Sequence, residues 1–123
     1  MIIRGKESFF EFNVQSHEEI AKMCRDNNLA NIGELYSDSI EGVNKTIEMA
    51  IIMNRAYEDH KAYDEPGYKQ EYLTMDDFKF MLYPEVSQLE KILTETMQEG
   101  RSREIETEPV KSKPSKNAEP AKE

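Results

Sequence analysis

A long segment, residues 39–62, constrains the fold of this chain more than any other feature. Its apolar residues recur at helical spacing on two faces. One face carries Ile40, Val43, Ile47, Ala50 and Ile51, and the other carries Met49, Ile52, Met53 and Ala56. From Met49 to Ala56 the helix is apolar nearly all round, which is typical of a helix enclosed by neighbours or of one with an interface on its second face. We therefore expect a central helix on the order of 30 Å long.

The N-terminal residues predict two short strands. Residues 1–4 and 8–14 have the composition of strands, and residues 5–7 would join them. Phe10 and Phe12 alternate with polar residues in the second strand, so that one of its faces is apolar. A two-stranded ribbon is only marginally stable by itself. We therefore expect the helices that follow to pack on its apolar face.

Start and stop signals predict a first helix between the ribbon and the central segment. Ser16, followed three residues later by Glu19, has the form of a capping box. The helix that Ser16 opens would end near Asn27 and Asn28. Residues 29–36 then have helical spacing over a short stretch, which indicates either a short helix or an irregular connection.

The second half of the body predicts two more helices. Residues 64–67 contain a Pro-Gly breaker that ends the central helix. Thr74 caps the next helix, whose buried side would be formed by Phe78, Met81 and Leu82. The last helix would have Pro84 as its first residue and Gly100 as the C′ residue that ends it. The sequence thus predicts a mainly α fold, with a short N-terminal β-hairpin followed by a bundle of four or five helices.

Charged and aromatic residues divide the chain into two parts. The formal net charge is −9, with 10 basic and 20 acidic residues in residues 1–100 but 6 and 5 in residues 101–123. All 11 aromatic residues precede residue 84. The last part has too little apolar surface to offset the entropy lost on ordering. We predict one compact helical domain over residues 1–100 and a disordered tail over residues 101–123.

The composition excludes several classes of function. Non-specific nucleic-acid binding depends on Lys and Arg. Because residues 1–100 are acidic, we do not expect them to bind nucleic acid directly. Cys24 is the only cysteine, which excludes an internal disulfide, and its place on an apolar stripe predicts a buried thiol. No apolar run is long enough to span a membrane. We expect a soluble, cytosolic protein.

No catalytic, cofactor or metal site is predicted. His17 and His60 lack the spacing of zinc ligands. The acidic residues between Glu58 and Glu65 lack the spacing of a calcium-binding loop, so a solvated helix end is the better interpretation. In a body with 20 acidic residues, the proximity of two carboxylates says nothing about acid–base catalysis. We expect a protein that is not an enzyme and that uses no cofactor.

Tyrosines indicate a candidate surface for a partner or for self-association. A tyrosine combines apolar area with one polar end and therefore suits protein interfaces. The alternative is that the tyrosines pack locally, where the loop after the central helix folds over the helices. The predicted surface consists of Met49, Ile52, Met53, Ala56, Tyr57, Tyr63, Tyr68 and Tyr72, and Tyr83 belongs to the same group of tyrosines.

The order of these elements resembles the tail assembly chaperones of long-tailed, siphophage-type bacteriophages. The resemblance covers roughly residues 2–100 and follows order and pattern. It rests on the ribbon Ile3-Arg4-Gly5-Lys6-Glu7 before Phe10-Glu11-Phe12, a capped helix, a long apolar helix, the start Leu73-Thr74-Met75-Asp76-Asp77-Phe78 and the closing helix at Tyr83-Pro84-Glu85. Residues 57–73 are longer and richer in charge and tyrosine than the family pattern.

The resemblance implies a protein that binds the tape measure protein, keeps it soluble and helps tail-tube protein to assemble around it. Such chaperones act in the cytoplasm of the bacterial host, are not part of the mature virion and self-associate as homo-oligomers. In many of these phages a ribosomal frameshift appends a second domain, and the tail over residues 101–123 is a suitable place for it. Lys116-Asn117 could be encoded by a slippery sequence.

The acidic body leaves one alternative function open. The protein could be an acidic regulator or a nucleic-acid-mimic inhibitor that binds a basic protein through its charge. Salt would separate the two functions, because a partner held by charge dissociates as the salt concentration rises, whereas apolar contacts persist.

Overall fold

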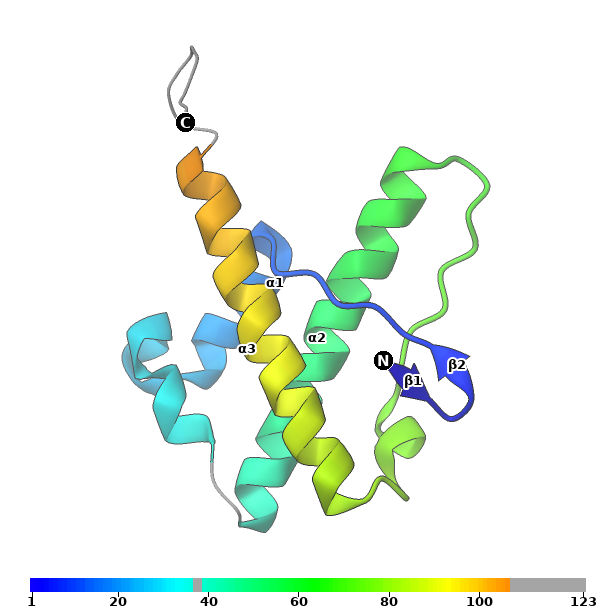
Figure 1. Ribbon diagram of the computed structural model, residues 1–123. Coiled ribbons are helices and arrows are strands. Elements are labelled where there is room, and N and C mark those ends of the chain that lie inside the picture. The colour runs from blue at the N-terminus through cyan, green and yellow to red at the C-terminus, as the bar shows by residue number, and fades with distance from the viewer. Residues whose placement is uncertain (37–38, 107–123) are drawn as a thin grey trace.

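The computed structural model describes residues 1–36 and 39–106 (Figure 1). These residues form the predicted mainly α fold with a short N-terminal β-hairpin. The α-helices are α1 (Val14–Met23), α2 (Ile40–Asp64) and α3 (Tyr83–Glu106). The 3₁₀ helices are η1 (Arg25–Asn27), η2 (Leu29–Leu35) and η3 (Met75–Phe78). The prediction of a disordered tail lies outside the described residues from residue 107 onward, whereas residues 101–106 belong to α3.

Helices α2 and α3 form the framework of the molecule. Both begin at the same end of the molecule and diverge toward the other end (Figure 1). Helix α2 begins where the sequence predicts, because the Ser39 hydroxyl accepts a hydrogen bond from the Gly42 N–H at 3.2 Å. It ends at Asp64, just before Pro66 and Gly67. The boundaries of this helix thus follow from a local cap and a local breaker.

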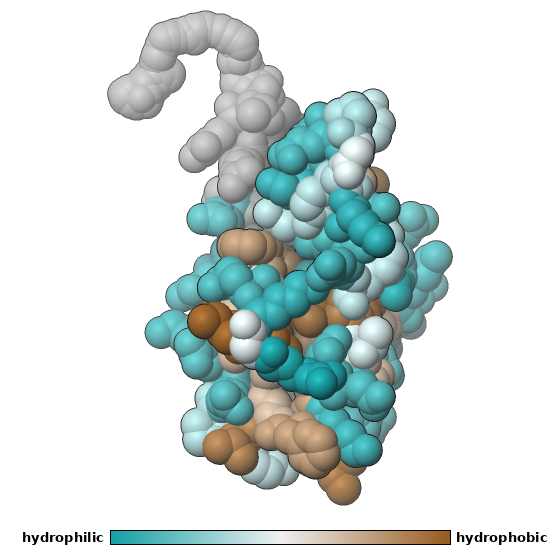
Figure 2. Space-filling model, turned by 90° about the vertical axis from the view of Figure 1, so that its right-hand side faces the viewer, coloured by the Kyte–Doolittle hydropathy of each residue, from teal (hydrophilic) through white to brown (hydrophobic). Residues whose placement is uncertain are grey.

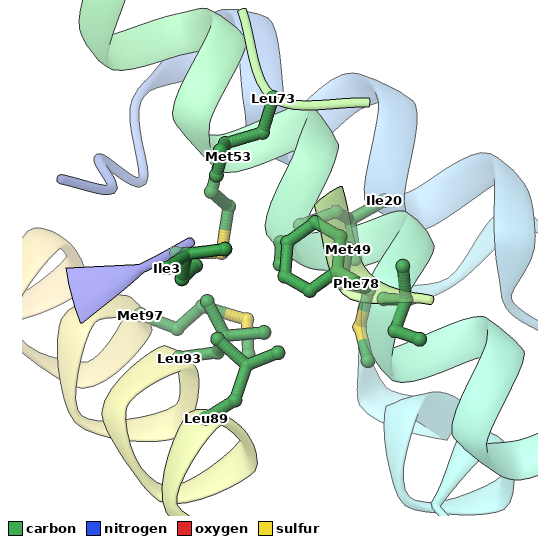
Figure 3. Close-up of a cluster of buried hydrophobic side chains, with 11 residues drawn as sticks. Ile3, Ile20, Met49, Met53, Leu73, Phe78, Leu89, Leu93 and Met97 are labelled. Carbon is green, nitrogen blue, oxygen red and sulfur yellow. The ribbon is translucent and has the colours of Figure 1, made fainter. Parts of the chain in front are cut away.

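The hydrophobic core lies between these two helices and is closed by shorter elements. Figure 3 shows the core side chains of α2 and α3 facing one another, with Ile3, Leu73 and Phe78 directed into the same space. The buried residues of this cluster are Ile3, Ile20, Ile47, Met49, Ala50, Met53, Leu73, Phe78, Leu89, Leu93 and Met97. The hairpin, α1 and η3 therefore cover a core that the two long helices could not close by themselves.

The hairpin is shorter than predicted, and its second strand was wrongly placed. Strand β1 (Ile2–Ile3) pairs antiparallel with β2 (Lys6–Glu7). Arg4 and Gly5 connect them with φ angles of 54° and 76°, as a type I′ turn requires. This turn folds the chain back at once, so that β2 uses residues that the sequence pattern had assigned to the connection.

Residues 8–13, predicted as part of a strand, instead form an extended connection that we call the crossing segment. It runs from the hairpin across α2 to α1 (Figure 1). The Glu11 N–H donates a hydrogen bond to the Met53 carbonyl at 3.0 Å, and the Asn54 side chain donates one to the Phe9 carbonyl at 3.0 Å. Ser8 still pairs with Met1 beside the hairpin, whereas the Phe9 carbonyl and the Glu11 N–H bind α2.

Helix α1 begins earlier than predicted. Its N-cap is Asn13, whose side-chain oxygen accepts from the Ser16 N–H at 3.1 Å, while the Asn13 N–H donates to the Ser16 hydroxyl at 2.9 Å. The prediction of Ser16 as the N-cap was therefore wrong, because Ser16 is the third residue of the helix and closes the capping box. The helix also ends earlier, at Met23.

Helix α3 does not end at Gly100, as the sequence predicted, but continues to Glu106. Gly100 has another role there. A Cβ atom at this position would lie 2.6 Å from the Phe12 carbonyl oxygen and 3.3 Å from the Phe12 Cβ. Because that space is already filled, only glycine lets the crossing segment approach α3 this closely.

The helix predicted after Thr74 is only the short 3₁₀ helix η3. Its capping box is present, since the Asp77 carboxylate accepts from the Thr74 N–H at 2.7 Å. Phe78 is buried as predicted, but Leu82 is exposed, contrary to the prediction. The chain leaves the helical path after Phe78 and enters α3 at Tyr83, so Leu82 is not on the same helical face as Phe78.

Candidate interaction surfaces

The predicted candidate surface divides between the core and the exterior. Met49, Met53 and Ala56 have no solvent exposure, so in this fold they are core residues and not part of a surface. Ile52 is partly exposed. The structure thus resolves the two interpretations of the central helix for these positions, because its second apolar face is largely enclosed by neighbours.

Of the four tyrosines in the predicted surface, three have partners within the chain, and two, Tyr63 and Tyr72, are exposed. The Tyr57 ring lies 5.2 Å from that of Phe9. Tyr68 donates to Glu58 at 2.9 Å, and Tyr72 donates a hydrogen bond to Asp59. Tyr63 is 86% exposed. The structure therefore does not bring these four tyrosines together as one exposed surface.

The acidic residues at the end of α2 hold the loop that follows. Glu58 is buried and accepts hydrogen bonds from the Tyr68 hydroxyl and from the Glu71 N–H, the latter at 3.0 Å. The hydrogen bond to Glu58 raises the pKa of Tyr68 to about 12. Glu58 is thus a structural acceptor, and the interpretation of this run as a solvated helix end was wrong at this position.

Asp59 has a similar role on the neighbouring side of α2. Its carboxylate accepts from Gln15 at 2.8 Å and from Gln70 at 2.6 Å, in addition to Tyr72. Partial burial acts to raise the pKa of Asp59, but the hydrogen bonds from Tyr72, Gln15 and Gln70 outweigh it and lower that pKa. Asp59 therefore links α1 to the loop.

The side chains of Cys24 and His60 make contacts that support the fold. The Cys24 thiol is buried and contacts the Ile20 carbonyl at 3.4 Å, and burial raises its pKa. This confirms the prediction of a buried thiol. His60 lies between Glu11 at 2.7 Å and Asp64 at 3.1 Å, and the hydrogen bond to Glu11 raises the pKa of the imidazole. In residues 1–36 and 39–106, no three or more His, Cys, Asp or Glu side chains are placed to hold a metal ion.

Exposed apolar side chains gather where the hairpin meets the connection from η3 to α3. Ile2, Phe80, Leu82 and Tyr83 are 63%, 86%, 67% and 65% exposed, and we call these four residues the Phe80 patch. Figure 2 shows apolar side chains at the lower end of the face that carries the hairpin. A cleft of about 410 Å³ lies beside the patch, between Ile2 and Arg4 of the hairpin and Lys79 and Phe80 of the connection. Apolar patches of this kind often mark interaction sites.

Sequence reasoning missed most of the Phe80 patch, although a signal was present. Phe80, Met81, Leu82 and Tyr83 are four consecutive apolar or aromatic residues. One face of a helix or strand cannot bury four consecutive side chains, so some of them must be exposed. Tyr83 was among the tyrosines considered as an interface, and it is exposed here.

A second apolar depression, which we call the α1–α2 groove, lies between α1 and α2. Its volume is about 690 Å³. Met23, Ile51, Ile52 and Met75 supply its apolar residues. Its polar residues are Gln15, Glu18, Glu19, Lys22, Glu48 and Arg55. Of the predicted surface residues, only Ile52 lines this groove.

No helix of the described residues is long and apolar enough to cross a membrane. A comparison with models of protein families, with curated proteins and with solved structures finds no match.

Proposed function

We propose that the protein is a non-enzymatic tail assembly chaperone, which binds the tape measure protein of a long-tailed phage and promotes assembly of the tail tube around it. The Phe80 patch is the observation that carries this proposal. The resemblance in element order supplies the identity of the partner. The chaperone would act in the host cytoplasm and be absent from the mature virion.

Physical properties of the patch support the binding of an apolar partner. Burying a large apolar side chain contributes roughly 1.5–3 kcal/mol. The patch offers Phe80, Leu82, Tyr83 and Ile2, all of them largely exposed, and Ile2 and Phe80 line the same cleft. Their exposure leaves apolar area uncovered in the single chain. A partner segment that covers these side chains would in turn be kept from aggregating. This is the activity that a chaperone of an apolar protein needs.

Co-expression with the tape measure protein of the same genome tests the proposal. We expect the wild-type chain to keep that protein soluble and to co-purify with it at high salt. The double variant Phe80→Asp, Leu82→Asp should lose both effects, because the charges prevent desolvation of the patch. Val14→Asp is the matched control, since Val14 is 74% exposed in the first turn of α1, outside the patch.

Two outcomes would contradict the proposal. One is a double variant that is folded and still co-purifies with the tape measure protein. The other is a complex that dissociates steeply as salt rises and is unaffected by the double variant, which would instead support the acidic regulator. Thermal unfolding of each variant verifies that a loss of binding is not a loss of folding.

A further inference from the structure

The α1–α2 groove has the dimensions of a binding site for a helix. On α1 it extends from Gln15 to Met23, and on α2 from Glu48 to Arg55. Each of these stretches is about two helical turns long. A docked helix presents anchors at i, i+3 or i+4 and i+7, which is also about two turns.

The apolar residues of the groove can adapt to apolar helix faces of different shapes. Ile51 and Ile52 come from α2, Met23 from α1 and Met75 from η3. Met75 is about half exposed. Methionine side chains are flexible and polarisable, so they adapt to different apolar partners.

Charges at the rim favour a basic partner. Within the described residues, no hydrogen bond or ion pair engages the side chains of Glu18 and Glu19. Glu48 has only a 3.8 Å contact with Lys45. Two basic residues, Lys22 and Arg55, also line the groove. The Arg55 guanidinium lies over the Tyr72 ring, 5.6 Å from its centre. With a net charge of −9 on the whole chain, basic segments are attracted and acidic ones are repelled.

We propose that the α1–α2 groove binds a basic amphipathic helix of a partner protein, with the apolar stripe of that helix on Met23, Ile51, Ile52 and Met75 and its Lys or Arg residues beside Glu18 and Glu19. This proposal deepens the proposed function. It rests on that function in one respect, namely that the chain binds another protein. The groove would bind a basic amphipathic helix, whereas the Phe80 patch would bind an apolar segment.

A peptide of roughly 18 residues, about five turns, made of leucine and lysine with one apolar face is the probe. We expect methyl NMR signals of Ile51, Ile52, Met23 and Met75 to shift on titration. Glu18→Lys with Glu19→Lys should weaken binding about tenfold, because two attractive contacts become repulsive. Glu41→Lys with Glu95→Lys, two exposed positions outside the groove, is the matched control with the same change of net charge.

The outcomes separate this proposal from its alternatives. Equal weakening by both pairs of substitutions would mean general charge attraction and would overturn the proposal. So would shifts centred on Ile2 instead of the groove, or equal binding of a leucine and glutamate peptide with the same pattern. The Phe80→Asp, Leu82→Asp variant should bind the peptide as the wild type does. If the peptide binds the groove but the tape measure protein does not co-purify, the groove proposal holds and the proposed function fails.

Discussion

At the scale of single residues, Asn54 joins three parts of the chain. Its side chain is 2% exposed, donates to the Phe9 carbonyl at 3.0 Å and accepts from the Leu73 N–H at 2.9 Å. A buried amide costs free energy unless it is hydrogen-bonded. Here both of its ends bind backbone groups of segments that have no regular structure of their own. Asn54 therefore fixes the crossing segment and the loop before η3 on α2.

We predict that Asn54→Ala lowers the free energy of unfolding by about 2–4 kcal/mol, because the buried Leu73 N–H and the partly buried Phe9 carbonyl lose their partner. Denaturation in guanidinium chloride measures the change. Asn44→Ala is the matched control, since Asn44 is an exposed asparagine on the same helix, and it should change the stability by less than about 0.5 kcal/mol. Similar values for the two variants would contradict the role of Asn54.

The importance of Asn54 and Glu58 could not be predicted from the sequence. Both residues lie on α2, but their partners Phe9, Leu73 and Tyr68 come from segments whose position is decided by tertiary packing. Nothing in the local pattern around a polar residue on a helix indicates such a partner. The buried thiol of Cys24 was predictable, because its place on an apolar stripe is a local property.

At the scale of elements, the close approach of α3 to the crossing segment depends on Gly100. We predict that Gly100→Ala costs about 1–2 kcal/mol, because overpacking against Phe12 exceeds the gain in helix propensity. Thermal unfolding measures the effect. Gly33→Ala is the control, since a Cβ there would meet no atom within 4 Å. A Gly100→Ala protein as stable as the wild type would show that the approach is not constrained.

Elements were predictable where a local signal decides them. The Ser39 cap and the Pro66 breaker give α2 its boundaries, and the predicted start near residue 39 and the predicted end at the Pro-Gly breaker agree with them. Gly100 was misread because glycine serves equally as a helix end and as a site of close packing. The start of helix α1 was misread, because the predicted capping box opens at Ser16, whereas the structure has Asn13 as the N-cap and Ser16 as the residue that closes the box.

At the scale of the whole molecule, the pH dependence of stability should reflect His60. This residue connects the end of α2 to Glu11 of the crossing segment, and its pKa is raised by that contact. The contribution to stability is fully present below the ordinary histidine pKa of 6.5 and is lost as the pH rises through the raised value.

We predict that His60→Gln destabilises the protein more at pH about 6 than at pH about 9. The difference should be below about 1 kcal/mol, because His60 is half exposed and solvent screens the pair. Urea denaturation at the two pH values gives the difference. In a Glu11→Gln background the pH dependence of the same substitution should shrink, and an undiminished effect would assign it to another group.

The fold class was predictable for the whole molecule, whereas the candidate surfaces were not. Helical periodicity shows which apolar residues share a face of a helix, but it does not show which of these faces other elements cover. Met53 and Phe80 are both large apolar residues, yet one is fully buried and the other is exposed. The difference arises because α3, α1 and the crossing segment cover α2, while the turn after η3 directs the chain outward.

The contact between Phe12 and Gly100 also bears on how the protein is made. A ribosome synthesises residue 12 long before residue 100, so the crossing segment has no α3 to pack against during most of translation. Until α3 is synthesised, the core contacts of α2 and the hairpin with α3 cannot form. Because this contact joins residues about ninety positions apart, completing the domain depends on long-range contacts that only the full body of the chain can make.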